Sequence, residues 1–363
     1  MNTGDIRPGP LLTAALFIPG LLYGAAIRVR NRLYDHGLLA VRRLPCPTIA
    51  FGNLTVGGTG KTPLTSFTAA ALRDAGYRVG ILSRGYRRAG RAALVVSDGR
   101  RLLADAAQAG DEPYLMARDN PAAAVAVGAD RGAAADLLLA AAPAEVVLLD
   151  DAFQHRAIHR DLNILVVDGR DPFGNGRILP FGPLREPITG VRRADAVVVT
   201  RGGGVPPPSL LRALEQHHSD VAVFHAAIAP RGFADPSGEA AGLAALRGFS
   251  AYAFAGIARP ERLEEDLGAL GVRLAGARRF PDHHPYRARD LEEIAAAARA
   301  CGAEVLVTTE KDLVRLPGLP PVSPPLFALS IGVTFPDAGF TGFLLDRLGA
   351  AGRPAPAGAG GGR

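Results

Sequence analysis

The chain has 363 residues, of which 48% are hydrophobic and 21% charged, so it can bury a core and is not disordered throughout. Its net charge of +6 comes from 41 basic residues spread along the sequence, and aromatic residues make up only 6%, so we predict no nucleic-acid partner. Two cysteines, Cys46 and Cys301, are too few for a disulfide framework or a four-thiolate zinc site.

The first predicted element is the apolar stretch at residues 11–27, which contains Pro19-Gly20 and is followed by three arginines within residues 28–32. A secretory signal carries its positive charge before the apolar stretch, so the order here argues against one. We predict that residues 1–35 form a broken or amphipathic helix that lies on a membrane surface, with its arginines at anionic headgroups. An ordinary core helix is the alternative, and a true membrane span is less favoured because the stretch is short.

Short apolar runs along the rest of the chain predict strands that are covered on both faces, because they are continuous instead of alternating. They lie at residues 47–51, 79–82, 92–96, 124–127, 146–149, 163–167, 196–200, 251–255 and 305–308. Stretches of helical spacing lie between many of them, at residues 64–75, 131–142, 209–217, 262–270 and 289–300. This alternation predicts an α/β fold built on a parallel sheet.

The most specific motif follows the first of these strands and opens the first of these helices. It consists of Thr55, Val56, Gly57, Gly58, Thr59, Gly60, Lys61 and Thr62. Strand, glycine-rich loop and helix in this order predict a P-loop, whose backbone N–H groups and helix N-terminus surround phosphate oxygens. Lys61 would meet the β and γ phosphates of ATP, and Thr62 would place its hydroxyl on Mg²⁺. Thr55 stands where the usual pattern has glycine, and a glycine-rich turn without a ligand is the alternative.

An acidic strand end completes the expected nucleotide site. The run at 146–149 is followed by Asp150 and Asp151, and a carboxylate at this place holds Mg²⁺ directly or through water. Many strands end in aspartate, so the pair carries weight only together with the P-loop upstream.

Breaker residues predict the domain organisation. A cluster at 202–208 and a loop-like stretch at 230–243 separate two halves, and residues 351–363 read as a flexible tail. We predict a membrane-associating segment at 1–35, a P-loop nucleotide domain at 36–205 and a smaller α/β domain at 206–350.

Further motifs, taken together with these, match one family. They lie at 52–53, 57–63, 83–86, 110–113, 150–156, 182–187, 255–257, 280–284 and 308–312. In this order and combination the chain resembles the tetraacyldisaccharide 4'-kinases, the lipid A 4'-kinases of Gram-negative bacteria. The resemblance implies Mg²⁺-dependent transfer of the γ-phosphate of ATP to the 4'-hydroxyl of a tetraacylated glucosamine disaccharide 1-phosphate, giving lipid IVA. It also implies a peripheral protein on the cytoplasmic face of the inner membrane, and we expect a monomer.

The resemblance also suggests roles for individual residues. Asp111 is the candidate base for the attacking hydroxyl, and His283 would pair with it across the two halves. From spacing alone, Asp111 is equally suited to cap the helix that follows it. The other candidates are Glu112 as a Mg²⁺ ligand, and Asn53, Arg84, Arg185 and Glu186 as contacts to phosphate or substrate.

The segment Glu310-Lys311-Asp312 follows a predicted strand end. It would contact nucleotide, help the two halves close, or form a solvated charged turn.

Two other functions are alternatives to the lipid kinase. One is an ATP-dependent switch of the partition type, whose variant P-loop carries a second lysine just before the two glycines; here that position is Val56, which counts against it. The other is a kinase of a different small molecule, with the N-terminal segment in its core. A switch would hydrolyse ATP slowly without an acceptor, whereas the lipid kinase requires an acylated disaccharide.

Overall fold

The computed structural model describes residues 10–316, 318 and 320–350. The first lobe contains α1 (Pro10–Asp35), β1 (Thr48–Gly52), α2 (Lys61–Asp74), β2 (Val79–Ser83), β3 (Leu94–Asp98), α3 (Ala106–Ala109), α4 (Asp111–Asp119), β4 (Ala124–Val127), α5 (Arg131–Ala141), β5 (Val146–Leu149), β6 (Leu162–Asp168), η1 (Ile188–Arg193), β7 (Ala196–Thr200) and α6 (Pro208–His217). The rest contains β8 (Ala222–Ala234), β9 (Ala240–Ala241), β10 (Ser250–Ala255), α7 (Glu261–Ala269), β11 (Arg273–Arg279), α8 (Ala288–Ala300), β12 (Val305–Thr309), α9 (Glu310–Leu313), β13 (Leu326–Thr334) and α10 (Gly339–Ala350).

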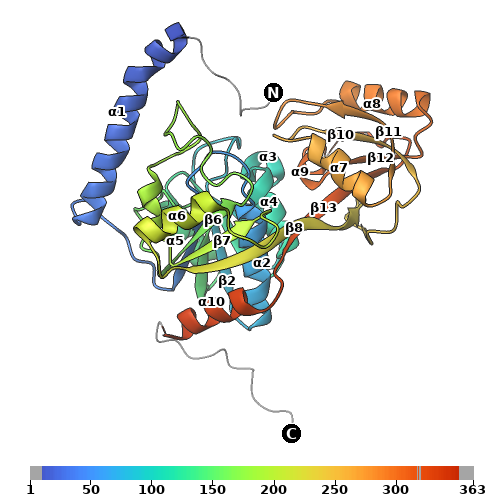
Figure 1. Cartoon of the computed structure of the whole chain (residues 1–363). Helices are drawn as coiled ribbons and strands as arrows, with labels where there is room; N and C mark the ends of the chain where they lie inside the picture. The colour runs from blue at the N-terminus through green and yellow to red at the C-terminus, as the bar shows by residue number, and fades with distance from the viewer. Residues whose placement is uncertain (1–9, 317, 319, 351–363) are drawn as a thin grey trace.

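One mixed, mostly parallel sheet runs through both lobes (Figure 1). Its strand order is β11-β10-β12-β13-β8-β7-β6-β1-β5-β2-β4-β3, with β9 paired to β8. The antiparallel pairs are β3 with β4, β8 with β13 and β8 with β9. The predicted α/β class, with a P-loop-type parallel sheet and a smaller second α/β half, is confirmed.

The central strands of the first lobe are buried along their whole length because helices cover both faces of the sheet. All residues of β1, β2, β5 and β7 are buried, as their continuous apolar sequences predict. In a parallel sheet the carboxyl ends of the strands share one edge, and ligands bind outside that edge. The loops after β1, β2, β5 and β7 therefore meet at one place, and the site is built from them.

The long strand β8 joins the two lobes. Its first part pairs in parallel with β7, from Ala222 to Ala226, and its second part pairs antiparallel with β13, from Ala227 to Ala234. Figure 1 shows β8 and β13 running from the first lobe into the second, where α7, α8 and α9 surround β10, β11 and β12. Two hydrogen-bonded strands thus fix how the second lobe faces the edge that carries the site.

Two helices that the predicted boundaries assign to the second half pack on the first lobe. Leu210 and Leu214 of α6 share a core with Val197 of β7, and Phe340 of α10 shares one with Leu64 of α2. The boundaries at 36–205 and 206–350 stay a prediction. The packing shows that some segments after residue 205 in the sequence belong to the core of the first lobe.

Helix α1 stands to one side of the first lobe (Figure 1) and is continuous through Pro19. One face docks on residues 178–186: the hydroxyl of Tyr23 donates to the carbonyl of Arg185 at 3.0 Å. On another face Leu21, Leu22 and Val29 are 56%, 66% and 55% exposed. Judged by length and apolarity together, none of the helices in the described part of the chain could span a bilayer.

Candidate active site

The glycine-rich loop connects β1 to α2, as the sequence predicts. Gly60 is the N-cap of α2 with φ +91°, a conformation that strains other residues, and a Cβ there would displace Cδ1 of Ile228, which lies 2.2 Å from that position. Gly57 also has positive φ, at +115°. Thr55, by contrast, forms a β-bridge with Leu184, which explains why this position does not need the glycine of the usual pattern.

Two residues at the end of β7 hold the backbone of this loop through hydrogen bonds. The hydroxyl of Thr200 donates to the carbonyl of Thr59 at 2.9 Å, and Nη1 of Arg201 donates to the carbonyl of Gly58 at 2.6 Å. The bonds turn two loop carbonyls toward β7. The hydroxyl of Thr59 and Nδ2 of Asn53 are both buried, and neither has a hydrogen-bond partner in the described part of the chain. Two unsatisfied polar groups beside a glycine loop are what an anionic ligand would satisfy.

Lys61, the first residue of α2, is buried at the centre of the site. Its Nζ donates to Oδ1 of Asn53 at 3.1 Å and lies 3.5 Å from Oδ1 of Asp151. Burial lowers the pKa of Lys61, and the attraction of Asp151 only partly offsets that effect. The chain therefore keeps a poorly solvated ammonium beside the loop, and a phosphate would stabilise it.

Asp150 lies fully buried beneath the start of α2. Its carboxylate accepts hydrogen bonds from the hydroxyls of Thr65 and Ser83, each at 3.2 Å, and from that of Thr62 at 3.4 Å. Burial, together with the negative charges of Glu112 and Asp151, raises the pKa of Asp150 to about 7. A cation placed here would reverse that effect.

Asp151 is held in a left-handed conformation, with φ +48°, which is uncommon for a residue other than glycine. Nη1 of Arg185 donates to both of its oxygens, at 2.9 and 3.1 Å. Burial opposes ionisation of Asp151, but Lys61 and Arg185 outweigh it and hold its pKa below the ordinary value. Such a backbone is kept where tertiary contacts fix it, often at functional sites.

The donors around Asp150 suit Mg²⁺, which prefers oxygen ligands and keeps several waters and substrate phosphates in its shell. Hydroxyl and carboxylate oxygens of Thr62, Asp150 and Asp151 meet beside the phosphate loop. No group of three or more His, Cys, Asp or Glu residues in the described part of the chain is arranged to hold a metal by itself. The oxygen donors beside the phosphate loop fit Mg²⁺ whose shell is completed by phosphate and water.

A second cluster joins the two lobes at Asp111. Nδ1 of His283 lies 2.9 Å from its Oδ2, and Arg315 reaches the same atom through Nε at 2.8 Å and Nη2 at 2.6 Å. Burial alone would raise the pKa of Asp111, but these two partners outweigh it and hold that pKa below its ordinary value. The cap alternative is wrong, because Gly110 is the N-cap of α4 and Asp111 is its first helical residue.

Helix α9 provides further pairs across the lobes. Lys311 pairs with Glu112, and this partner lowers the pKa of the carboxyl. Arg118 pairs with Glu310 in the same interface. Glu310 and Lys311 thus place this segment at the interface between the lobes, and Asp312 is fully buried, so the solvated turn that the sequence left open is wrong.

Glu186 is fully buried, and each of its oxygens accepts hydrogen bonds. Arg193 donates to both at 2.7 and 2.8 Å, Gln154 donates at 2.8 Å, and Asn31 of α1 donates at 3.0 Å. Gln154 also donates to the carbonyl of Asn53, at 2.8 Å. Glu186 thus connects α1 to the residue that holds Lys61.

Arg84 lies exposed on the loop after β2. Sequence reasoning missed Arg315, Thr65, Ser83, Gln154 and Arg193, all of which contact predicted site residues. Ser83 had a signal, because it ends a strand at the ligand edge of the sheet. Arg315 had none, because its role depends on how the lobes face each other.

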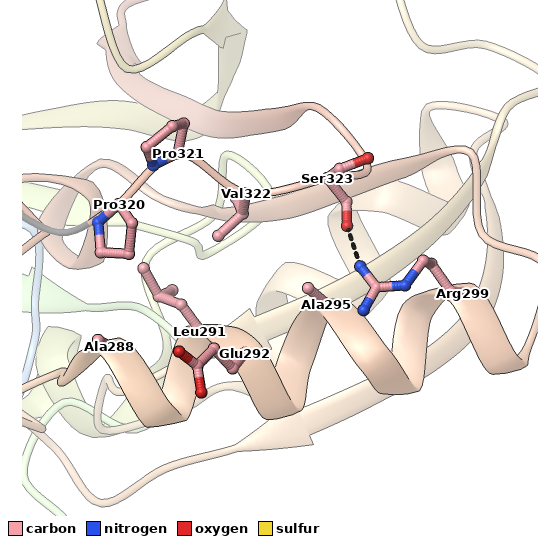
Figure 2. A pocket seen from close by; sticks show the side chains of 9 residues that line it. All are labelled: Ala288, Leu291, Glu292, Ala295, Arg299, Pro320, Pro321, Val322 and Ser323. Carbon is pink, nitrogen blue, oxygen red and sulfur yellow. Dashed lines mark hydrogen bonds between the residues drawn. The ribbon is translucent and has the colours of Figure 1, made fainter.

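A shallow hollow outside this site lies between α8 and residues 320–323 (Figure 2). Leu291 and Pro320 line it, and Arg299 closes one end by donating to the carbonyl of Ser323 at 2.8 Å. None of the predicted site residues belongs to its lining.

Comparison with known proteins gives one consistent result. The family model described as tetraacyldisaccharide-1-P 4'-kinase matches residues 12–349. Among relatives named tetraacyldisaccharide 4'-kinase, that of Anaeromyxobacter dehalogenans strain 2CP-C is 45% identical over 316 residues, covering 85% of this chain and 84% of the relative. That of Desulfatibacillum aliphaticivorans is 40% identical over 365 residues, covering 96% of both. The crystal structure of "apo" form LpxK from Aquifex aeolicus in complex with ATP has a TM-score of 0.75 and 34% identity, covering 93% of this chain and 99% of that one.

Proposed function

Because the chain belongs to the tetraacyldisaccharide-1-P 4'-kinase family, we propose that the site described above performs this family's reaction with the residues assigned below. The protein is a kinase of lipid A biosynthesis that uses ATP to phosphorylate the 4'-hydroxyl of a tetraacyldisaccharide 1-phosphate. One observation carries the assignment: the ammonium of Lys61 is buried at the end of a glycine loop, between Asn53 and Asp151.

The glycine loop and Lys61 bind the triphosphate. Nδ2 of Asn53 and the N-terminus of α2 offer donors to phosphate oxygens, backbone N–H groups of the glycine loop would add others, and Lys61 adds a positive charge. Arg185, and Arg84 on the exposed loop, supply further positive charge for the phosphates of ATP or of the lipid. Thr62, Asp150 and Asp151 would hold Mg²⁺, which would neutralise charge on the phosphates when bound. Glu112, whose negative charge acts on both Lys61 and Asp150, would add a further Mg²⁺ ligand. Glu186 we leave outside this set, because it is fully buried and both of its oxygens accept hydrogen bonds from the protein.

Asp111 removes the proton of the acceptor alcohol. As the O–H bond of the 4'-hydroxyl breaks, its proton passes to the carboxylate of Asp111 and the oxygen bonds to the γ-phosphorus. The bond from that phosphorus to the β–γ bridging oxygen breaks, and ADP leaves. His283 and Arg315 keep Asp111 ionised beforehand, because both donate to its Oδ2.

Helix α1 holds the protein on the cytoplasmic face of the inner membrane, and the protein acts as a monomer. Leu21, Leu22 and Val29 are exposed although apolar, and Arg28 and Arg32 lie on the same helix. Such a helix lies in the membrane interface, with apolar side chains in the acyl region and arginines at anionic headgroups. Attached there, the site meets an acceptor whose acyl chains stay in the bilayer.

The test compares the parent chain with Lys61→Ala in detergent micelles that contain the tetraacylated disaccharide 1-phosphate and labelled ATP. The parent should transfer label to the lipid, and Lys61→Ala should transfer none at equal folded content. Near-normal transfer by Lys61→Ala would refute the assignment of the loop. Flotation with anionic vesicles tests the membrane claim: Leu21→Ser/Leu22→Ser should bind vesicles less than the parent, and equal binding would contradict the role of α1.

A further inference from the structure

The two oxygens of Asp111 have different surroundings. Every hydrogen bond and ion pair of this side chain to the described residues ends on Oδ2, which receives Nδ1 of His283 and both Nε and Nη2 of Arg315. An ionised carboxylate only accepts, so His283 donates through Nδ1–H. Oδ2 thus faces both cationic partners, whereas Oδ1 has no hydrogen bond or ion pair with any residue in the described part of the chain.

Arg315 is held in place by contacts within its own lobe. Its side chain is 9% exposed, and Nη1 donates to Oδ1 of Asp312 at 3.0 Å and to the carbonyl of Gly256 at 2.9 Å. Asp312 is fixed in turn by the N–H of Gly256 at 2.9 Å and the hydroxyl of Tyr286 at 3.0 Å. The contacts of Nη1 therefore hold the guanidinium in an orientation in which Nε and Nη2 face Asp111.

The same glycine also holds His283. The N–H of His283 donates to the carbonyl of Gly256 at 2.9 Å, and His283 itself has φ +61°, in the left-handed region. A Cβ at Gly256 would lie 3.0 Å from Cβ of His284 and 3.1 Å from Oδ1 of Asp312. One peptide unit of the second lobe thus positions both groups that grip Asp111 of the first lobe.

We propose that Arg315 is a positioning residue that, together with His283, occupies Oδ2 of Asp111 and so leaves Oδ1 as the atom that takes the proton from the acceptor alcohol. The proposal rests on the role of Asp111 as base in the proposed function. Because the guanidinium holds Oδ2, the carboxylate of Asp111 cannot rotate freely, and the direction of Oδ1 is fixed. A lone pair of Oδ1 is then already oriented toward the acceptor hydroxyl before the reaction.

A simpler role for Arg315 would be to stabilise the interface between the lobes through its ion pair with Asp111. The chain offers a matched control that separates this role from positioning. Arg118 of α4 pairs with Glu310 of α9 across the same interface, and Asp111 is not among the partners of either. If ion pairs here only hold the lobes together, removing Arg118 and removing Arg315 should have the same kind of effect. If Arg315 orients the carboxylate of Asp111, removing Arg315 should lower kcat, whereas removing Arg118 should not.

The experiment measures kcat and KM of the full chain for Arg315→Ala, Arg315→Lys and Arg118→Ala, with the tetraacylated disaccharide 1-phosphate and ATP. We expect Arg315→Ala to lose about a hundredfold in kcat, the scale of a misaligned reacting group, with both KM values within about threefold of the parent. Arg315→Lys keeps the positive charge but loses the planar guanidinium, so its kcat should lie between those of the parent and of Arg315→Ala. Guanidinium ion added at low millimolar concentration should restore part of the kcat of Arg315→Ala and none of that of Arg118→Ala.

Each failure has its own signature. If Arg315→Ala and Arg315→Lys both keep the parent kcat while Asp111→Asn is inactive, Asp111 is the base and the proposal for Arg315 is wrong. The proposal is equally overturned if the loss in Arg315→Ala appears only in KM, or if guanidinium ion restores nothing. If Asp111→Asn itself keeps the parent kcat, the proposed function of Asp111 fails first. Should Arg315→Ala not fold, Arg315→Lys and Arg315→Gln carry the same comparison.

Discussion

Replacing Asp111 by asparagine separates catalysis from stability more sharply than any other single change. The amide has almost the same shape, but it cannot take the proton of the acceptor hydroxyl. General base catalysis contributes about 10²- to 10⁴-fold, so kcat should fall by this factor, which equals roughly 3–5 kcal/mol of activation free energy. KM should change little, because the base acts in the transition state.

The effect on folding should be smaller, for a reason visible in the structure. Arg315 keeps Asp312 at 3.0 Å and the carbonyl of Gly256 at 2.9 Å when the charge of Asp111 is removed. The buried guanidinium is therefore not left without a partner, and the variant loses only the charged character of its bonds to residue 111. We expect a loss of about 1–2 kcal/mol in the free energy of unfolding, and a fall of a few degrees in Tm.

The assay follows label from ATP into lipid in mixed micelles, beside thermal unfolding of the same preparations. Asp290→Asn is the matched control. Asp290 also pairs with a histidine, His284, at 3.2 Å, but both residues lie in the second lobe and the pair does not include Asp111. That variant should keep kcat close to the parent value. If Asp111→Asn keeps its kcat while Tm falls, Asp111 is a structural partner of Arg315 and its role as base is refuted.

Three further predictions follow from the same structure. Gly60→Ala should weaken ATP binding and lower stability by about 2 kcal/mol or more, because the new Cβ would lie 2.2 Å from Ile228 at φ +91°; an unchanged Kd in a calorimetric titration would contradict this. Chelating divalent metal with EDTA should stop label transfer, and added Mg²⁺ should restore it; full turnover in excess chelator would rule out the metal role given to Asp150 and Asp151. Burial, with Arg131 and Arg160 nearby, lowers the pKa of His155 from 6.5 to about 4, so the unfolded chain binds its proton first and stability falls as pH drops from 6.5 toward 4. By pH 5 this should cost the parent about 1–2 kcal/mol after allowance for the partly exposed ring, and His155→Gln should show a flatter decline; parallel Tm curves would contradict it.

The sequence predicts the first lobe well because its signals are local. A strand buried on both faces is mainly apolar, and every residue of β1, β5 and β7 is buried, with a threonine only at one end of β1 and of β7. The glycine loop is equally local, because its geometry needs φ values that glycine supplies within a few residues of Lys61. These features require no knowledge of the rest of the fold.

The elements that the sequence did not predict depend on distant partners. β8 and β13 pair residues such as Ala234 and Ala328, far apart in the chain, and much of β8 is only partly buried, so neither run stands out. β11 is an edge strand with three arginines in seven residues and shows no apolar run. The first helix ends at Asp35, the end predicted for this segment, but its contact with the first lobe depends on a distant partner, since Asn31 donates to Glu186.

The candidate site shows the same division. The pairing of Asp111 with His283 lies across the lobes and was expected only from family resemblance, whereas the contacts of Lys61 and Asp150 follow from strand–loop–helix order. Arg315 follows α9, and in sequence it is an ordinary charged residue. Only the orientation that β8 and β13 give to the second lobe turns it toward Asp111.

The central claim is that this chain moves the γ-phosphoryl group of ATP to the 4'-oxygen of an acylated disaccharide. It is tested most directly by incubating the purified chain with Mg²⁺, labelled ATP and the tetraacylated disaccharide 1-phosphate, and then locating the new phosphate by phosphorus NMR. We predict one ADP for each lipid that gains a phosphate monoester at the 4' position. ADP released while the lipid keeps only its 1-phosphate would contradict the claim and favour an ATPase switch.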